Sequence, residues 1–203
     1  MDQKINDSLY VKGEERFGSL GSRMYSLSKI IPTMRNFYKF TLGDLEKMEF
    51  ENVLDIGSGN GFVLMELGKR VPKFSGTGID PSPQMVKVAS VKATKRGLSN
   101  RLKFEIGSSR QIPHNENFDL IYTTMSFHHW KEREKSIQGI MERLNDNGKF
   151  LVYEVTDNGS FSRKFVKSHL MDANTFKAIA GKEELDIELK EKNGFIRCMF
   201  IKH

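Results

Sequence analysis

The stretch Val53–Gly61 constrains the fold of this chain more than any other part of the sequence. It starts as a largely apolar run of the strand-forming type and ends in three glycines, Gly57, Gly59 and Gly61. Because glycine has no Cβ, such a loop can turn sharply and let a ligand approach the backbone closely. A buried strand that runs into a glycine-rich loop ahead of a helix is typical of an α/β sheet that binds a nucleotide.

Two details of this loop argue against a dinucleotide. The glycines follow the spacing G-x-G-x-G, and Phe62 stands where the dinucleotide fingerprint requires its third glycine. Asp55 also places a carboxylate beside the loop, which would repel a pyrophosphate and attract an ammonium group. The expected ligand is therefore nucleoside-like at one end and cationic at the other, and S-adenosylmethionine fits this description.

A second acid follows at the end of the next expected strand. Phe74–Asp80 reads as that strand, and Asp80 comes about 20 residues after Gly59. An acid at the tip of the second strand of a β-α-β unit can accept hydrogen bonds from both hydroxyls of a ribose. Ser82 and Pro83 then fit the N-cap and the first position of a helix. The other interpretation is that Asp80 only caps this helix.

Apolar periodicity predicts alternating strands and helices along most of the chain. Strands are expected at about 52–57, 74–79, 101–106, 118–124 and 149–155. Helices are expected between them at about 61–71, 82–96 and 131–145, with one more that begins at Pro32 and a helical stretch near 161–180. A length of 203 residues suits a single core.

The C-terminal part of the sequence predicts a hairpin. Two apolar runs, Leu185–Lys192 and Phe195–Ile201, are separated only by Asn193-Gly194. Asn-Gly is a strong hairpin signal because both residues tolerate positive φ. Since a two-residue turn joins only antiparallel strands, the otherwise parallel sheet should finish with an antiparallel strand.

These segments together resemble the class I S-adenosylmethionine-dependent methyltransferases, in particular the small ubiquinone/menaquinone-type and related methyltransferase-domain proteins. The resemblance covers about residues 50 to 157 and rests on four motifs: Val53–Gly61, Gly78–Asp80, Phe104–Pro113 and Phe118–Trp130. It implies an α/β fold, a Rossmann-like, doubly wound, mixed seven-stranded sheet of order 3-2-1-4-5-7-6. In that fold strand 7 is antiparallel and an N-terminal helical cover is present.

The resemblance also implies which residues bind the cofactor, S-adenosylmethionine, whose product is S-adenosylhomocysteine. They are Asp55, Gly57, Ser58, Gly59, Asp80, Pro81, Met85, Ser108, Ser109, Thr124 and Tyr25. One position departs from the family pattern, because an acid usually follows the glycine of the third motif and bonds the adenine amino group. Here Gly107 is followed by Ser108, whose hydroxyl can accept the same bond without the strength that a charge adds.

The candidate catalytic residues are His128 and His129, which follow the fourth expected strand. Ligands of open parallel sheets bind at this end of the strands. A general base is needed only when the methyl acceptor must lose a proton, so both histidines are also compatible with a structural role. Tyr25 and Glu154 are weaker candidates for the base. No metal site is expected, because adjacent histidines rarely converge on one ion and no further ligands cluster near them.

Residues 1–31 are polar and glycine-dotted, and we expect them to form a lid or cover segment over the methyltransferase domain, residues 32–203. No stretch is apolar enough to span a bilayer, no signal peptide is evident, and the lone Cys198 suits a reducing compartment. We therefore expect a cytoplasmic location and no insertion into a membrane.

Three classes of function stay open. The leading one is methyl transfer to an O, N or C nucleophile of a small-molecule substrate. The net charge of +6 makes binding of nucleic acid possible, so an RNA or protein methyltransferase is the second class. Acids are interspersed among the basic residues, which favours a solvated lysine-rich surface. A non-catalytic cofactor-binding subunit is the third class, and the sequence leaves the oligomeric state open.

Overall fold

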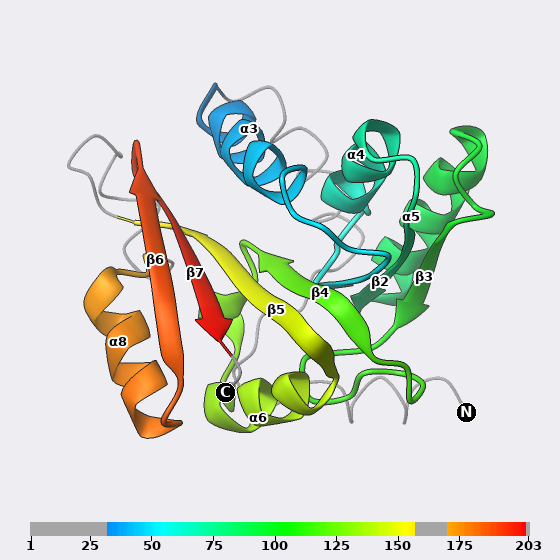
Figure 1. The fold of residues 1–203 in the computed structure, drawn as a ribbon. Coiled ribbons are helices and arrows are strands. Elements are labelled where there is room, and N and C mark those ends of the chain that lie inside the picture. The colour runs from blue at the N-terminus through cyan, green and yellow to red at the C-terminus, as the bar shows by residue number, and fades with distance from the viewer. Residues whose placement is uncertain (1–31, 157–169, 202–203) are drawn as a thin grey trace.

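The computed structural model describes residues 32–156 and 170–201. Within these ranges seven strands form one sheet of order β3-β2-β1-β4-β5-β7-β6 (Figure 1). The strands are β1 (Asn52–Ile56), β2 (Ser75–Asp80), β3 (Leu102–Ile106), β4 (Phe118–Thr124), β5 (Leu144–Val155), β6 (Asp186–Lys192) and β7 (Phe195–Ile201). β7 is antiparallel to β5 and β6, and the other neighbouring pairs are parallel. The predicted strand order and the antiparallel last strand are confirmed.

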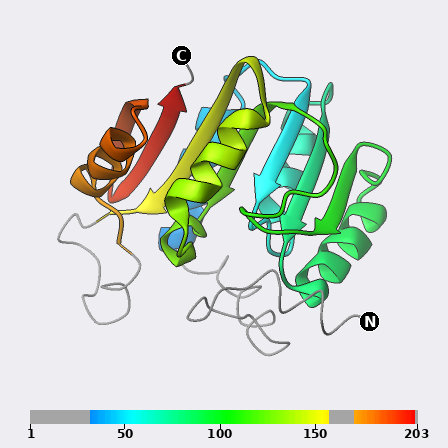
Figure 2. The same cartoon turned by 90° about the horizontal axis from the view of Figure 1, so that it is seen from below.

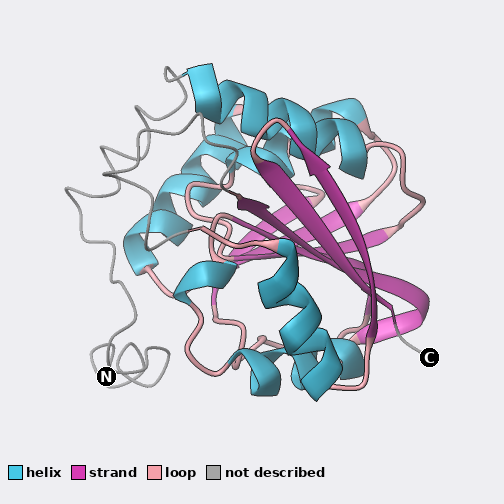
Figure 3. Ribbon diagram, turned by 90° about the vertical axis from the view of Figure 1, so that its left-hand side faces the viewer, coloured by secondary structure: helices cyan, strands magenta, loops and turns pink. Residues whose placement is uncertain are grey.

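Helices cover both faces of the sheet, as the doubly wound fold requires (Figure 3). They are α3 (Pro32–Leu45), α4 (Phe62–Arg70), α5 (Pro83–Lys95), the short 3-10 helix η2 (Phe127–His129), α6 (Arg133–Glu142) and α8 (Ala173–Lys182). In Figure 2, α6 lies in front of the sheet and α3 behind it. In the described part of the chain, no helix is both long and apolar enough to cross a membrane.

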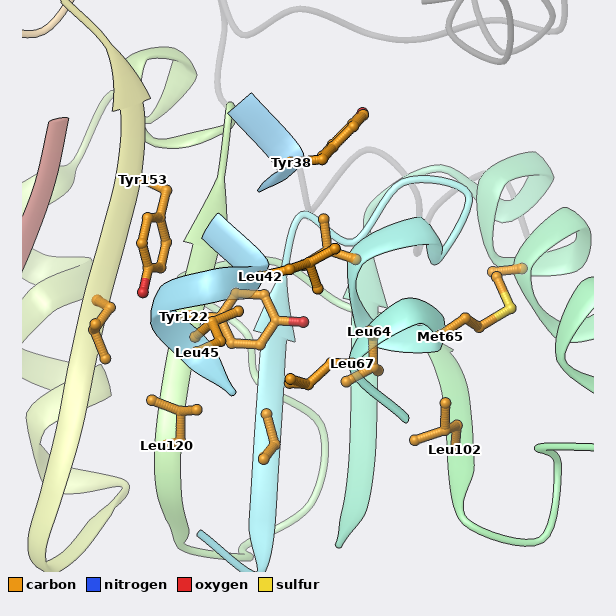
Figure 4. Packing of buried hydrophobic residues seen from close by; sticks show 14 of the residues in the cluster. Tyr38, Leu42, Leu45, Leu64, Met65, Leu67, Leu102, Leu120, Tyr122 and Tyr153 are labelled. Carbon is orange, nitrogen blue, oxygen red and sulfur yellow. The ribbon is translucent and has the colours of Figure 1, made fainter. Parts of the chain in front are cut away.

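The alternation of side chains along each strand divides the interior into two hydrophobic cores. On β1, Val53 belongs to the core beneath α3, α4 and α5, and Leu54 belongs to the core beneath α6 and α8. Figure 4 shows part of the first core, where Leu42 and Leu45 of α3 meet the sheet beside Tyr122. The buried faces of both helical layers therefore hold the carboxyl ends of β1, β2 and β4 in a fixed arrangement.

The local signals that place these elements are those expected from the sequence. The Ser82 hydroxyl accepts a hydrogen bond from the Met85 amide at 3.4 Å, and Pro83 occupies the first position of α5. At the C-terminal hairpin, Asn193 and Gly194 both have positive φ, 53° and 81°, and Lys192 pairs with Phe195 across the turn.

One strand begins earlier than predicted. β5 starts at Leu144, inside the range assigned to a helix, and α6 ends at Glu142. Leu144 pairs with Phe118, but the register then shifts so that Lys149 pairs with Leu120. Asn147 lies in this irregular segment and has a φ of 65°. The residues between Leu144 and Lys149 therefore do not follow the regular pairing of a strand. The predicted helical stretch near 161–180 is only partly helical in the described residues: 170–172 are not helical, and α8 runs from Ala173 to Lys182. Residues 157–169 lie outside the described ranges.

A buried ionic cluster fastens α3 to the last strands of the sheet. Asp44, near the end of α3, accepts a hydrogen bond of 2.9 Å from the Tyr153 hydroxyl. It also contacts the Lys190 ammonium group, and the Arg197 guanidinium lies 3.4 Å away. Because these partners come from β5, β6 and β7, the single carboxylate ties one helix to three strands.

Loss of the Asp44 charge is expected to weaken the fold. Asp44→Asn would leave the largely buried Arg197 with the more exposed Glu188 carboxylate, 2.7 Å from its Nη2, as its remaining ion-pair partner among the described residues, and we expect the free energy of unfolding to fall by about 2 kcal/mol. Urea denaturation measures this change. Glu46→Gln, which removes an exposed ion pair with Arg70, is the control and should cost under about 0.5 kcal/mol. Equal effects of the two substitutions would contradict the anchoring role of Asp44.

Candidate functional site

The glycine loop after β1 folds back over the end of β2. Gly57, Gly59 and Gly61 all have positive φ, at 73°, 54° and 73°. The amides of Gly57 and Ser58 both donate to the Ile79 carbonyl at 2.9 Å. A Cβ on Gly57 would lie 2.8 Å from the Ser126 Cβ and collide with its hydroxyl. Glycine is therefore required at this position by both backbone conformation and space.

Asp80 connects the glycine loop to the start of α5. Its Oδ2 accepts the Gly59 amide at 2.9 Å, and its Oδ1 accepts the Ser82 amide at 2.9 Å. The N-cap of α5 is Ser82, so Asp80 does more than cap this helix. Burial raises the pKa of Asp80 to about 6, against the opposing effect of the two amide hydrogen bonds. Each carboxylate oxygen keeps a lone pair with which it can accept one more donor.

Asp55 lies inside β1 and is buried behind the loop. Its Oδ2 accepts a hydrogen bond of 3.1 Å from the Tyr122 hydroxyl on the neighbouring strand β4. Burial raises the pKa of Asp55 to about 8; the Tyr122 hydrogen bond opposes this shift, and the Asp80 charge adds to it. Its Oδ1 has no partner among the described residues.

The turn after β3 places its two serines differently. Ser108 and Gln111 exchange two backbone hydrogen bonds of 3.1 Å, which makes a tight turn. The Ser108 side chain is buried, and its hydroxyl has no partner in the described ranges. In contrast, the Ser109 hydroxyl lies 2.9 Å from that of Ser136 on α6. Only one of the two predicted serines therefore keeps an unpaired buried hydroxyl.

The remaining predicted cofactor residues lie near this edge of the sheet or outside the described residues. Pro81 follows Asp80 directly, and Met85 is buried in the first turn of α5. Thr124 is the last residue of β4 and pairs with Tyr153. Tyr25, together with the expected cover segment 1–31, lies outside the described ranges.

His128 is held by a buried glutamate at the end of β5. The His128 Nδ1 lies 2.9 Å from Oε2 of Glu154, and the His128 amide donates to Oε1 at 3.2 Å. Glu154 is fully buried, and the His128 side chain is 5% exposed. The His129 ring packs against that of His128, with 3.9 Å between ring centroids. Across the described ranges, no three His, Cys, Asp or Glu side chains gather closely enough to hold a metal ion.

Three residues of this edge were not identified from the sequence. Ser126 lies against Gly57 and accepts a hydrogen bond of 3.2 Å from the Trp130 indole. Arg133 donates to the Phe127 carbonyl at 3.2 Å and to the His128 carbonyl at 2.8 Å. Tyr122 bonds Asp55, with which it pairs across β1 and β4. The strand register would have identified Tyr122, but nothing in the sequence marks the other two.

Unpaired buried polar atoms gather where a ligand would lie. Among the described residues, they include Asp55 Oδ1, Ser58 Oγ, both side-chain polar atoms of Asn60, Ser108 Oγ and Thr123 Oγ1. These residues come from β1 and its loop, the turn after β3 and the end of β4. Thr41 and Arg197 carry the others, in α3 and β7. Since buried polar groups are nearly always hydrogen-bonded, the gathering fits a polar ligand such as S-adenosylmethionine.

Comparison with known proteins agrees with this geometry. Residues 47–193 match the family model of a methyltransferase domain. The chain belongs to this family, the class I S-adenosylmethionine-dependent methyltransferases.

Individual relatives are similar to parts of this chain. Ajmaline N-methyltransferase of Rauvolfia serpentina is 30% identical over 121 residues, which is 59% of this chain and 40% of that protein. The ubiquinone/menaquinone biosynthesis C-methyltransferase UbiE of Geobacter sp. is 26% identical and covers 72% of this chain and 66% of its own length. The chain spans 28% to 40% of the length of several curated relatives.

The fold itself is shared over almost the whole chain with a solved structure. This is a putative S-adenosyl-L-methionine-dependent methyltransferase from Methanococcus maripaludis, with a TM-score of 0.78 and 18% identity. The similarity covers 95% of this chain and 97% of that one.

The buried state of Asp55 leads to a pH-dependent stability. Its pKa of about 8 in the fold exceeds the ordinary value of 3.8, so its stabilising contribution is complete at low pH and is lost as pH rises to about 8. Asp80 contributes in the same direction up to about pH 6. Between about pH 6 and pH 8, the unliganded chain should therefore lose about 2 kcal/mol relative to Asp55→Asn. Urea denaturation at several pH values in this range tests the prediction. If the free energy of unfolding changed with pH by the same amount in both chains, the prediction would be contradicted.

Proposed function

We propose that this chain catalyses methyl transfer from S-adenosylmethionine to a small molecule. The observation that carries the proposal is the Asp80 carboxylate, held by two backbone amides beside a glycine loop in the left-handed conformation. In this proposal Asp80 binds the ribose hydroxyls, and the loop from Gly57 to Gly59 binds the amino-acid end of the cofactor. Asp55, whose burial raises its pKa to about 8, would be ionised by the approach of the cofactor's ammonium group and would then supply the opposite charge. The cofactor supplies an electrophilic methyl group on its sulfonium.

The pairing of His128 with Glu154 favours a methyl acceptor that must lose a proton during the transfer. A hydroxyl group is the leading candidate for this acceptor. Glu154 binds Nδ1, so it orients the ring and stabilises the imidazolium that forms when Nε2 takes the proton. His128 is the proposed general base, Glu154 its positioning residue and His129 a packing partner. The transfer itself needs alignment and exclusion of water, which the proposed cover segment 1–31 would provide.

The small-molecule assignment also rests on the relatives. One is named for ajmaline and another for ubiquinone and menaquinone biosynthesis, which are small molecules. Transfer to RNA is the second candidate, because Lys87 and Lys95 lie exposed on α5, in a chain with a net charge of +6.

One experiment tests the proposed function and separates the two candidates. The purified chain is incubated with methyl-labelled cofactor and either a metabolite extract or tRNA. Label should pass to a metabolite, and Gly57→Ala should abolish both this transfer and the binding of S-adenosylhomocysteine in calorimetry. Gly43→Ala is the matched control, because a Cβ there meets nothing within 4 Å. Binding of NADH instead, or labelling of tRNA alone, would refute the proposal.

The proposed adenine contact gives a separate prediction. Ser108→Asp should tighten binding of S-adenosylhomocysteine about fivefold, because a carboxylate forms a charge-assisted bond to the exocyclic amine. Calorimetry measures the affinity. Ser109→Asp is the control: its side chain would meet Ser136 instead, so no gain is expected. A clear loss of affinity in Ser108→Asp with the fold intact would show that this side chain points elsewhere.

A further inference from the structure

A groove of about 370 Å³ separates α6 from α8, on the face of the sheet opposite α3, α4 and α5. Both helices lie on the same side of the sheet in Figure 1. The groove is lined by Lys131, Arg133, Glu134, Thr175, Ala178, Ile179 and Lys182. Its volume is within the range of small-ligand sites. None of the residues proposed to bind the cofactor lines it.

The lining of the groove is strongly cationic. Three basic side chains and one carboxylate leave two net positive charges. Glu134 lies 3.4 Å from the Lys182 ammonium group, so this acid is already shared with one of the three cations. The Thr175 hydroxyl already donates to Asp172 Oδ1 at 2.6 Å, so it offers a ligand no hydrogen, and Ala178 and Ile179 add an apolar wall. Such a lining matches a dianion that carries a short apolar group.

Arg133 is the most buried of the three cations. Its Nε and Nη2 donate to the Phe127 and His128 carbonyls, and its guanidinium lies 5.5 Å from the centre of the Phe127 ring. These bonds use two of its five N–H donors. Burial lowers the pKa of Arg133, and the nearby carboxylates of Glu154 and Glu134 oppose this shift. A bound anion would likewise stabilise the charged form.

We propose that this groove is a binding site for a phosphate monoester with a short alkyl or similarly apolar substituent. The planar guanidinium of Arg133 and the two lysine ammonium groups bind the phosphate, which suits their donor geometry. The apolar substituent packs on Ala178 and Ile179. Because Arg133 also bonds the carbonyl of His128, the ligand acts directly on the loop that carries this histidine. The site is additional to the proposed methyl transfer and does not depend on it.

Butyl phosphate and inorganic phosphate are the probes, at an ionic strength held constant with sodium chloride. Calorimetry measures binding to the full chain, and fluorescence reports the loop, since Trp130 is the only tryptophan and its ring lies 4.9 Å from that of Phe127. Butyl phosphate should bind at least threefold more tightly than inorganic phosphate and should change the fluorescence. Lys131→Ala and Lys182→Ala should each weaken it at least fivefold.

Lys177→Ala is the matched control, because Lys177 is exposed on α8, the helix that carries Lys182, but does not line the groove. It should leave the affinity unchanged, and saturating S-adenosylhomocysteine should not displace butyl phosphate. Equal weakening by Lys177→Ala would show that the phosphate responds to the overall positive charge of the surface and has no specific site in the groove. Displacement by S-adenosylhomocysteine would place the anion in the glycine loop. Either result overturns the proposed site, whatever the outcome of the methyl-transfer assay.

Discussion

Methyl transfer by the His128→Gln variant is expected to be about a thousandfold slower than by the unaltered chain, because positioned general bases contribute on this scale. The affinity for S-adenosylhomocysteine should stay within about twofold, since the proposed cofactor contacts come from other residues. Single-turnover measurements with labelled cofactor and the acceptor identified by labelling give the rate, and calorimetry gives the affinity.

Two further variants separate the roles at this end of the sheet. Glu154→Gln keeps the volume of the side chain but removes the charge beside His128 Nδ1, so kcat should fall about tenfold with KM unchanged. His129→Gln should change kcat by less than about threefold, because its ring packs beside the proposed base. Equal losses in the two histidine variants, or a change confined to KM, would remove His128 from the role of base.

The Asp80→Ala variant is expected to bind S-adenosylhomocysteine about a hundredfold more weakly, or by about 3 kcal/mol. The substitution removes the proposed acceptor of the ribose hydroxyls and also releases the Gly59 amide from its partner. As pH falls, protonation of Asp55, whose pKa is about 8, should weaken binding by both chains. The further decline through about pH 6, where Asp80 takes up a proton, should appear only in the unaltered chain. Calorimetry at several pH values measures both effects.

Asp119→Ala provides a matched control for this prediction. Asp119 also accepts two backbone amides, from Glu51 and Asn52, both at 2.9 Å, but these lie at the opposite end of β1. Its loss should lower stability and leave the affinity for the cofactor product unchanged. If both variants bind equally weakly, the effect of Asp80→Ala reflects damage to the fold.

Much of the fold could be predicted because local chemistry determined it. Asn193-Gly194 permits only a tight antiparallel connection, so the direction of the last strand followed from two residues. Ser82 and Pro83 set the start of α5 in the same way. The early start of β5 could not be predicted, because the irregular pairing around Asn147 depends on β4 as its partner. Periodicity within one segment does not contain that information.

The residues of the candidate site likewise fall into those that local sequence identifies and those that only the three-dimensional arrangement reveals. The glycines and Asp80 could be identified because their spacing along the chain reflects one β-α-β unit. The pairing of His128 with Glu154 joins the ends of two strands and depends on the three-dimensional arrangement. Arg133 is still less visible in the sequence, since its bonds go to backbone carbonyls that any residue could supply.

The contact between Ser126 and Gly57 limits how this chain can be altered. The serine occupies the space that a side chain on the glycine would need, so the turn after β4 packs directly against the loop after β1. A larger residue at position 126 would press on the loop proposed to bind the cofactor, even if it were chosen only to reshape the proposed acceptor site. Redesign for a new acceptor therefore has to keep Ser126 and vary the residues around it.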